Sequence, residues 1–226
     1  MKQKVSLIKL MKENRFDLVR ILVCYEENKD FEFDVNERDE EGYSVLDYAI
    51  LYDKEGIALS LLERHHCCFI NGHGEGIKIY SAGLAIKFHR YKVLKKMIEL
   101  QSFGDKPKMY FVHSGASKDY NLLMYAVVYK NLDAVKLLLD NGAQIGIGRR
   151  DGMNALSIAA IRAVDHGEHS TQNLIFRELL KRLKDHGAKE KIISRALDDL
   201  RAYAQTLDEP SITGKIEAIL ESARMY

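Results

Sequence analysis

The chain of 226 residues lacks most of the features that mark membrane, secreted or nucleic-acid-binding proteins. No apolar run approaches the roughly 18 residues of a membrane helix, and the N-terminal segment has no signal-peptide core. Three cysteines are too few for a disulfide framework and favour a reducing compartment. A formal net charge of +1 gives no general attraction to nucleic acid or acidic lipid. With only two prolines and 46% apolar residues, the chain is expected to be soluble and cytoplasmic.

Two short amphipathic helices are predicted between residues 121 and 143. Apolar residues recur at helical spacing on both sides of a polar break at Lys130 and Asn131. Asp133 places a carboxylate near the positive end of the second helix dipole, and Gly142 can adopt the left-handed conformation that ends a helix. Because neither helix exceeds about three turns, the pair must bury its apolar stripe against neighbours, which predicts a repeat.

The same pattern occurs in residues 39–71, and here the repeat resembles a known family. Asp39 and Gly42 fit the turn of the ankyrin repeat, D-x-x-G-x-T-P-L-H-x-A-A, with Ser44 at the Thr position and Leu46 at the Leu position. The tail of the repeat unit matches Asn141-Gly142-Ala143. The resemblance covers roughly residues 4–188 and is strongest in the second, fourth and fifth units, which cover about 39–71, 118–148 and 149–188.

This resemblance implies an all-α fold, an ankyrin-repeat solenoid of about five helical hairpins with β-turn fingers and a C-terminal helical cap. The two weaker units are expected at about 4–36 and 72–100, the cap at 189–226, and the whole ankyrin repeat domain at 1–188. The first unit carries lysines on its outer helix face, a polar surface of the kind that ends a stack of repeats in water.

Proteins of this family bind partner proteins through a concave surface of turn tips and first-helix residues. The resemblance assigns these positions to Tyr43, Leu51 and Tyr52, Lys87 and Phe88, Tyr120, Val128 and Tyr129, and Met153, Ile161 and Arg162. Five of them are aromatic, and tyrosine is enriched at binding hot spots because its contact area is large and its rotamer entropy small. The alternative is that some of them, Leu51 and Val128 above all, pack between neighbouring repeats.

The expected function is therefore non-catalytic binding of a partner protein, without a cofactor and without membrane insertion. The T-P-L-H sequence is missing and proline is scarce, and this divergence from the family pattern favours a pathogen effector acting on a host protein in the host cytoplasm. The competing hypothesis is an enzyme, a Cys/His hydrolase or a metal-dependent one, with its site in two inserts at 101–118 and 165–172. No catalytic residue is assigned, because no nucleophile or phosphate-loop motif is present.

One run of residues contains the side chains that bind zinc, His65, His66, Cys67 and Cys68. Adjacent ligands cannot easily converge on one tetrahedral ion, and neither C-x2-C nor H-x3-H occurs. The run also falls where the second helix of the repeat ends. A cationic helix cap with small buried thiols is the expected explanation, and no metal site is assigned.

Overall fold

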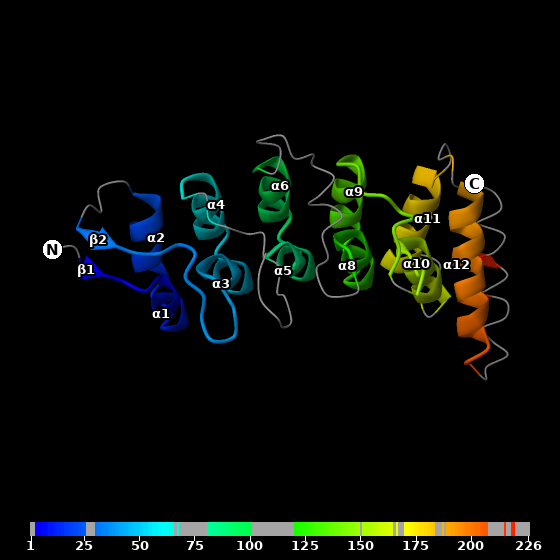
Figure 1. The fold of residues 1–226 in the computed structure, drawn as a ribbon, viewed down its shortest axis with the longest axis horizontal. Coiled ribbons are helices and arrows are strands. Elements are labelled where there is room, and N and C mark those ends of the chain that lie inside the picture. The colour runs from blue at the N-terminus through cyan, green and yellow to red at the C-terminus, as the bar shows by residue number, and fades with distance from the viewer. Residues whose placement is uncertain are drawn as a thin grey trace. The chain divides into compact units, whose positions relative to one another are not determined.

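The computed structural model describes residues 3–25, 30–65, 67, 81–100, 120–149, 151–164, 166, 170–183, 187, 189–207, 215 and 218–219. The chain divides into two compact units. The N-terminal unit comprises Met1–Pro107 with Ala116–Lys118, and the C-terminal unit comprises Lys108–Gly115 with Asp119–Tyr226. Each unit is built from short helices (Figure 1).

The described residues of the N-terminal unit form three helical hairpins, α1 (Leu7–Lys12) with α2 (Phe16–Cys24), α3 (Val45–Leu51) with α4 (Glu55–Glu63), and α5 (Ser81–Lys87) with α6 (Tyr91–Leu100). The first helices pack in the order α1, α3, α5 and the second helices in the order α2, α4, α6 (Figure 1). Strands β1 (Gln3–Lys4) and β2 (Phe31–Glu32) pair in parallel, with Gln3 opposite Phe31.

The C-terminal unit contains α8 (Leu122–Val128), α9 (Leu132–Asp140), α10 (Ala155–Val164), α11 (Thr171–Leu183) and α12 (Lys189–Ala204). α8 packs on α10 and α9 on α11, as in a stack of hairpins, and α12 covers α10. α11 begins at Thr171, inside the insert predicted at 165–172, because the Ser170 hydroxyl accepts a hydrogen bond from the Asn173 amide at 3.3 Å and starts the helix earlier. The second helix of the predicted cap lies almost entirely outside the described residues.

The first helix of three hairpins begins with the same cap. The Ser44 hydroxyl accepts from the Asp47 amide, and the side-chain oxygens of Asn121 and Asn154 accept from the amides three residues later. All three occupy the Thr position of the repeat. Serine and asparagine can replace threonine there because each offers an oxygen to an otherwise unpaired helical N–H.

The turn between the two helices of a hairpin also repeats. Asn14, Asp53, His89 and Lys130 all have φ between 57° and 59°. In each case the amide of the next residue bonds back across the turn, as from Asn131 N to Ala126 O at 2.9 Å. This six-to-one hydrogen bond ends the first helix and aims the chain into the second.

The predicted β-turn fingers are present in the second and fifth units. Gly42 and Gly152 both have a backbone φ of +86°, a conformation that residues with a side chain rarely adopt. The fingers close through Asp39 N to Tyr43 O at 3.0 Å and Arg149 N to Met153 O at 2.8 Å. The all-α architecture of hairpins with turn fingers is thus confirmed in both units, whereas the division at residue 188 stays a prediction.

Candidate partner-binding surface

The residues predicted to bind a partner lie where the first helices end and at the turn tips. Tyr52 and Tyr129 are the C-terminal cap residues of α3 and α8, and Phe88 directly follows α5. Tyr52 is 39% exposed, and Lys87 and Arg162 are also exposed. The other predicted residues are half-buried, namely Tyr43, Leu51, Phe88, Tyr120, Val128, Tyr129, Met153 and Ile161. No predicted tyrosine is fully buried, so all of them have surface available for contact.

In the N-terminal unit four aromatic rings touch in succession and form what we call the aromatic row, Phe16, Tyr52, Tyr48 and Tyr43. The ring centroids are 5.6 Å apart from Phe16 to Tyr52, 5.8 Å from Tyr52 to Tyr48 and 5.7 Å from Tyr48 to Tyr43. These separations fall within the range of favourable aromatic pairs. The row therefore connects a turn tip, the exposed side of α3 and the start of α2.

Two members of the row, Phe16 and Tyr48, were missed by the sequence prediction. Tyr48 is only 8% exposed and supports the rings of Tyr43 and Tyr52 on either side. Its spacing of four residues from Tyr52 in one helix was an available signal, since residues four apart share a helix face. Phe16 belongs to a different repeat, and no local spacing pointed to its contact with Tyr52.

Lysines lie against two rings of the row, Phe16 at one end and Tyr48 within it. The Lys54 ammonium lies 4.1 Å from the centroid of Phe16, and that of Lys12 lies 5.5 Å from the centroid of Tyr48. Both distances fit cation–π contacts. Lys12 also forms an ion pair with Asp39 at 2.8 Å. Positive charge is therefore held against the edges of the aromatic surface.

Asp39 connects the turn tip to this surface. Its carboxylate accepts hydrogen bonds from the Tyr48 hydroxyl at 2.7 Å and from the Tyr43 amide at 2.9 Å. Burial opposes the charged form, but the hydrogen bonds from Lys12, Tyr48 and the Tyr43 amide outweigh it and lower the pKa of Asp39 to about 2. A charged Asp39 thus holds Tyr43, Tyr48 and Lys12 in place.

We expect acid to remove the stabilisation that Asp39 provides. Because its pKa is lower in the folded state than in the unfolded chain, this stabilisation is complete above the ordinary value of about 4 and is lost as the pH falls through about 2. This pH dependence is checked by measuring the free energy of unfolding of wild type and Asp39→Asn in urea at several pH values. Wild type should be more stable at pH 6, and the difference should shrink toward pH 2. A difference independent of pH would contradict the charged state of Asp39.

The described residues of the C-terminal unit make two smaller aromatic contacts. The rings of Tyr125 and Tyr129 lie 4.8 Å apart, and burial, with the neighbouring Tyr129 hydroxyl, raises the pKa of Tyr125 to about 12. The Arg149 guanidinium lies 5.1 Å from the centroid of Tyr120 and donates a hydrogen bond of 3.0 Å to its hydroxyl. The predicted aromatic residues therefore fall into separate clusters within their own units.

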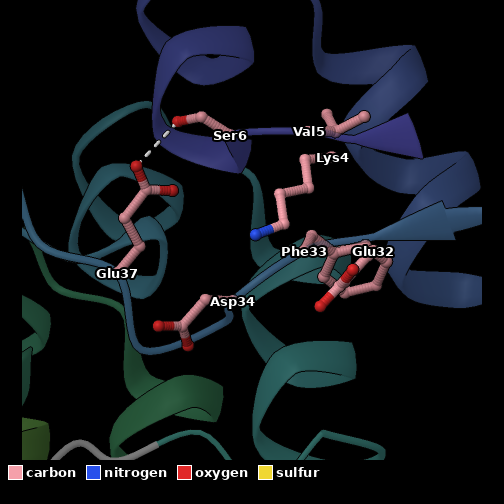
Figure 2. A pocket seen from close by; sticks show the side chains of 7 residues that line it. All are labelled: Lys4, Val5, Ser6, Glu32, Phe33, Asp34 and Glu37. Atoms are coloured by element: carbon pink, nitrogen blue, oxygen red, sulfur yellow. Dashed lines mark hydrogen bonds between the residues drawn. The ribbon is translucent and has the colours of Figure 1, made fainter. Parts of the chain in front are cut away.

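A pocket of about 360 Å³ lies beside the two strands (Figure 2). It is lined by Lys4, Val5, Ser6, Glu32, Phe33, Asp34 and Glu37. Within it the Ser6 hydroxyl donates a hydrogen bond of 2.9 Å to Glu37. The sequence did not reveal this pocket, because the parallel pairing of β1 with β2 joins segments that are far apart along the chain.

The described part of the histidine and cysteine run has structural roles. A ring nitrogen of His65, Nε2, lies 2.9 Å from the carbonyl of Val23, and its ring meets Phe33 edge-on at 5.6 Å. Cys67 is 3% exposed. His66 and Cys68 lie outside the described residues. Among the residues with a defined position, no three His, Cys, Asp or Glu side chains come together in a group that could hold a metal ion.

The enzyme hypothesis depends on two inserts, of which 101–118 lies outside the described residues. In the second insert His166 lies 3.1 Å from the Lys130 ammonium and 2.9 Å from the Arg162 carbonyl. These neighbours orient the imidazole, whose Nδ1–H donates to the Arg162 carbonyl, and among the described residues no serine, threonine or cysteine side chain is hydrogen-bonded to it. The helices in the described part of the chain are all too short or too polar to cross a membrane.

Comparison with known proteins finds the ankyrin repeat in one part of this chain. A model described as an ankyrin repeat matches residues 118–147, the fourth unit. A putative ankyrin repeat protein, L371, from Acanthamoeba polyphaga mimivirus is 25% identical over 192 residues. The match covers 74% of this chain but only 24% of the viral protein, so the chain spans about a quarter of the length of that relative.

Solved structures agree on the fold. An ankyrin repeat domain from Acinetobacter baumannii AYE has a TM-score of 0.65 at 18% identity, covering 96% of both chains. The ankyrin repeat protein EF0377 has a TM-score of 0.57 at 18% identity, covering 89% of this chain and 97% of its own. The ankyrin repeat domain of Bcl-3 has a TM-score of 0.52 at 17% identity, covering 78% of this chain and 68% of its own. Together with the turn fingers and stacked hairpins, these matches show that the chain has the ankyrin-repeat fold and that residues 118–147 match the ankyrin repeat itself.

Proposed function

We propose that this chain binds a partner protein through the aromatic row of its N-terminal unit. The contact of four rings in succession, with Tyr52 39% exposed at its centre, carries the proposal. Tyrosine suits such a surface because it offers a large apolar area with a polar tip. Ankyrin repeats in general mediate contacts between proteins, which supports the same function.

The row is also held in place before any partner arrives. Tyr48 is fixed by its hydrogen bond to Asp39, and Asp53, next to Tyr52, forms an ion pair with Arg90 at 2.8 Å. Side chains that are already ordered lose little entropy on binding, so more of the contact energy appears as affinity. A partner segment with apolar side chains and acceptor groups fits rings flanked by Lys12 and Lys54.

The finer form of the proposal is that the partner is a protein of a host cell and that the chain acts as an effector in the host cytoplasm. The relative in a mimivirus supports it, because that protein belongs to a virus. The experiment is expression of the tagged chain in candidate host cells, followed by fractionation and capture of bound proteins. Absence from the host cytoplasm would contradict this finer form and leave the binding function itself intact.

Binding by the aromatic row is tested by combining Tyr43→Ala with Tyr52→Ala. Loss of two hot-spot tyrosines should weaken binding of a captured and purified partner by at least about tenfold, while the circular dichroism spectrum stays unchanged. Tyr91→Ala is the matched control, because Tyr91 is 44% exposed in α6 and lies outside the row. Equal affinities for the double variant and wild type, or an equal loss in the control, would contradict the proposal.

A further inference from the structure

In the N-terminal unit the second helices of neighbouring hairpins contact each other in the same way. A side chain at the end of one helix reaches the sixth residue of the next. Cys24 Sγ lies 3.1 Å from Ser60 Oγ, and Glu63 forms an ion pair of 2.9 Å with Lys96. Ser60 is the sixth residue of α4 and Lys96 the sixth of α6. In α4 and α6, the sixth residue therefore faces the hairpin before it.

In α2 the corresponding residue is Ile21, and it is 46% exposed. The exposed fraction of the third residue also differs between α2 and the two second helices that follow it in this unit. Ile57 in α4 and Val93 in α6 are 4% and 1% exposed, whereas Leu18 in α2 is 37% exposed. Tyr25, one turn beyond Ile21, is 57% exposed. The side of α2 that later hairpins would bury against a neighbour is thus an apolar surface open to solvent, which we call the α2 face, Leu18, Ile21 and Tyr25.

This finding changes the prediction of a polar outer face for the first hairpin. Lys9 and Lys12 on α1 are exposed, as expected, but α2 is apolar at the corresponding edge. Figure 1 shows α2 as the first of the three second helices, with α4 following it. In the second and third hairpins this position is polar, Ser60 or Lys96, and it contacts a polar side chain of the hairpin before it, Cys24 or Glu63. An isoleucine at that position instead fits an apolar surface.

We propose that the α2 face joins two copies of this chain, an interaction that does not depend on the aromatic row. In a dimer with two-fold symmetry the same patch of both copies forms the interface, so an apolar patch contacts an apolar patch. The charges at its edges fit as well. At 100° per residue, Arg15 and Asp17 lie on opposite edges of the face, and among the described residues neither has an ion-pair partner. A parallel pairing of the two α2 helices brings Arg15 of one copy beside Asp17 of the other.

The other end of the described chain does not offer such a surface. α12 exposes Ser194, Arg195, Asp198 and Arg201, and Arg195 and Arg201 already form ion pairs with Asp199 and Asp198. A head-to-tail contact would place these charged groups against Ile21 and Leu18, at a desolvation cost that the contact does not offset. The α2 face of a second copy is the better match.

Sedimentation velocity of the whole chain tests the proposal, at protein concentrations up to about 1 mM, where an association through a small interface is populated. We expect a reversible dimer in wild type. Ile21→Glu should raise the dissociation constant at least about tenfold, because it places a carboxylate against its own copy. Leu174→Glu is the matched control, because Leu174 is also 46% exposed but lies on α11. A monomeric wild type, or equal effects of the two substitutions, overturns the proposal.

A charge exchange tests the orientation of the two helices. Arg15→Glu alone should weaken the dimer, because the carboxylate that it introduces then meets Asp17 of the other copy, and adding Asp17→Arg should restore it. Failure of the second substitution to restore the dimer overturns the parallel pairing. Both residues are exposed, and neither side chain caps α2, so the melting temperature should change little and report on folding separately.

Discussion

Phe176→Ala is expected to lower the free energy of unfolding of the C-terminal unit by about 3–5 kcal/mol, the usual cost of removing a buried phenylalanine. Phe176 is 1% exposed and is the bulkiest of the fully buried side chains. It belongs to α11, which packs on α10 and α9. The substitution leaves a cavity in the layer that holds these hairpins together. Hydrogen exchange should show faster exchange of amides throughout α10 and α11.

Leu174→Ala provides the control in the same helix. Leu174 lies two residues from Phe176 but is 46% exposed, so its truncation should change the free energy of unfolding by no more than about 0.5 kcal/mol. A similar loss for both variants would mean that α11 is turned differently from the arrangement described, with Leu174 in the core. Urea unfolding measured for the two proteins side by side distinguishes these outcomes.

Asp47→Ala is expected to cost the N-terminal unit about 2–4 kcal/mol, because it leaves buried hydrogen-bond donors without an acceptor. Asp47 is fully buried and accepts hydrogen bonds from the Ser81 hydroxyl at 2.6 Å, the Ser44 hydroxyl at 2.8 Å and the Ser44 amide at 2.9 Å. Ser81 is the first residue of α5, so this carboxyl group ties the second hairpin to the third. Urea unfolding of the variant measures the loss.

Asp47→Asn separates the role of the shape of this side chain from the role of its charge. Burial raises the pKa of Asp47, against the hydrogen bonds from Ser81 and Ser44. A raised pKa in the folded state means that stabilisation is present below the ordinary value near 4 and is lost as the pH rises through the raised pKa. Wild type should therefore lose stability relative to Asp47→Asn as the pH rises, opposite to the trend for Asp39. A constant difference would contradict a raised pKa.

Much of the fold could be predicted because its signals are local. The break at Lys130 and Asn131 is a helix-ending turn, and Gly42 has the positive φ that the family turn requires. Asp47 occupies the position of the histidine in the T-P-L-H sequence of the family pattern. The absence of that sequence made this chain match the family pattern less well, but the fold is the same. The Ser44 cap and the Ser81 hydroxyl supply hydrogen bonds that hold this position together.

The candidate surface was predicted less completely. Tyr43 and Tyr52 were identified from their repeat positions, but the two rings that complete the row depend on tertiary contacts, Phe16 with Tyr52 above all. The α2 face was missed for a similar reason. Leu18 and Ile21 read as ordinary helix core in the sequence, and only the stacking order of α2, α4 and α6 shows which side of α2 is left exposed.

The amino-acid sequence alone determined the helical hairpins, their caps and their turns, because these depend on hydrogen bonds and side-chain spacing within a few residues. It also predicted that a single hairpin is marginal in water and needs neighbours to bury its apolar stripe. The tertiary structure decided which rings touch, how Asp39 and Asp47 acquire opposite shifts in pKa, and which apolar face stays in contact with water. Those properties depend on burial and on distances between residues of different hairpins, which a linear pattern does not contain.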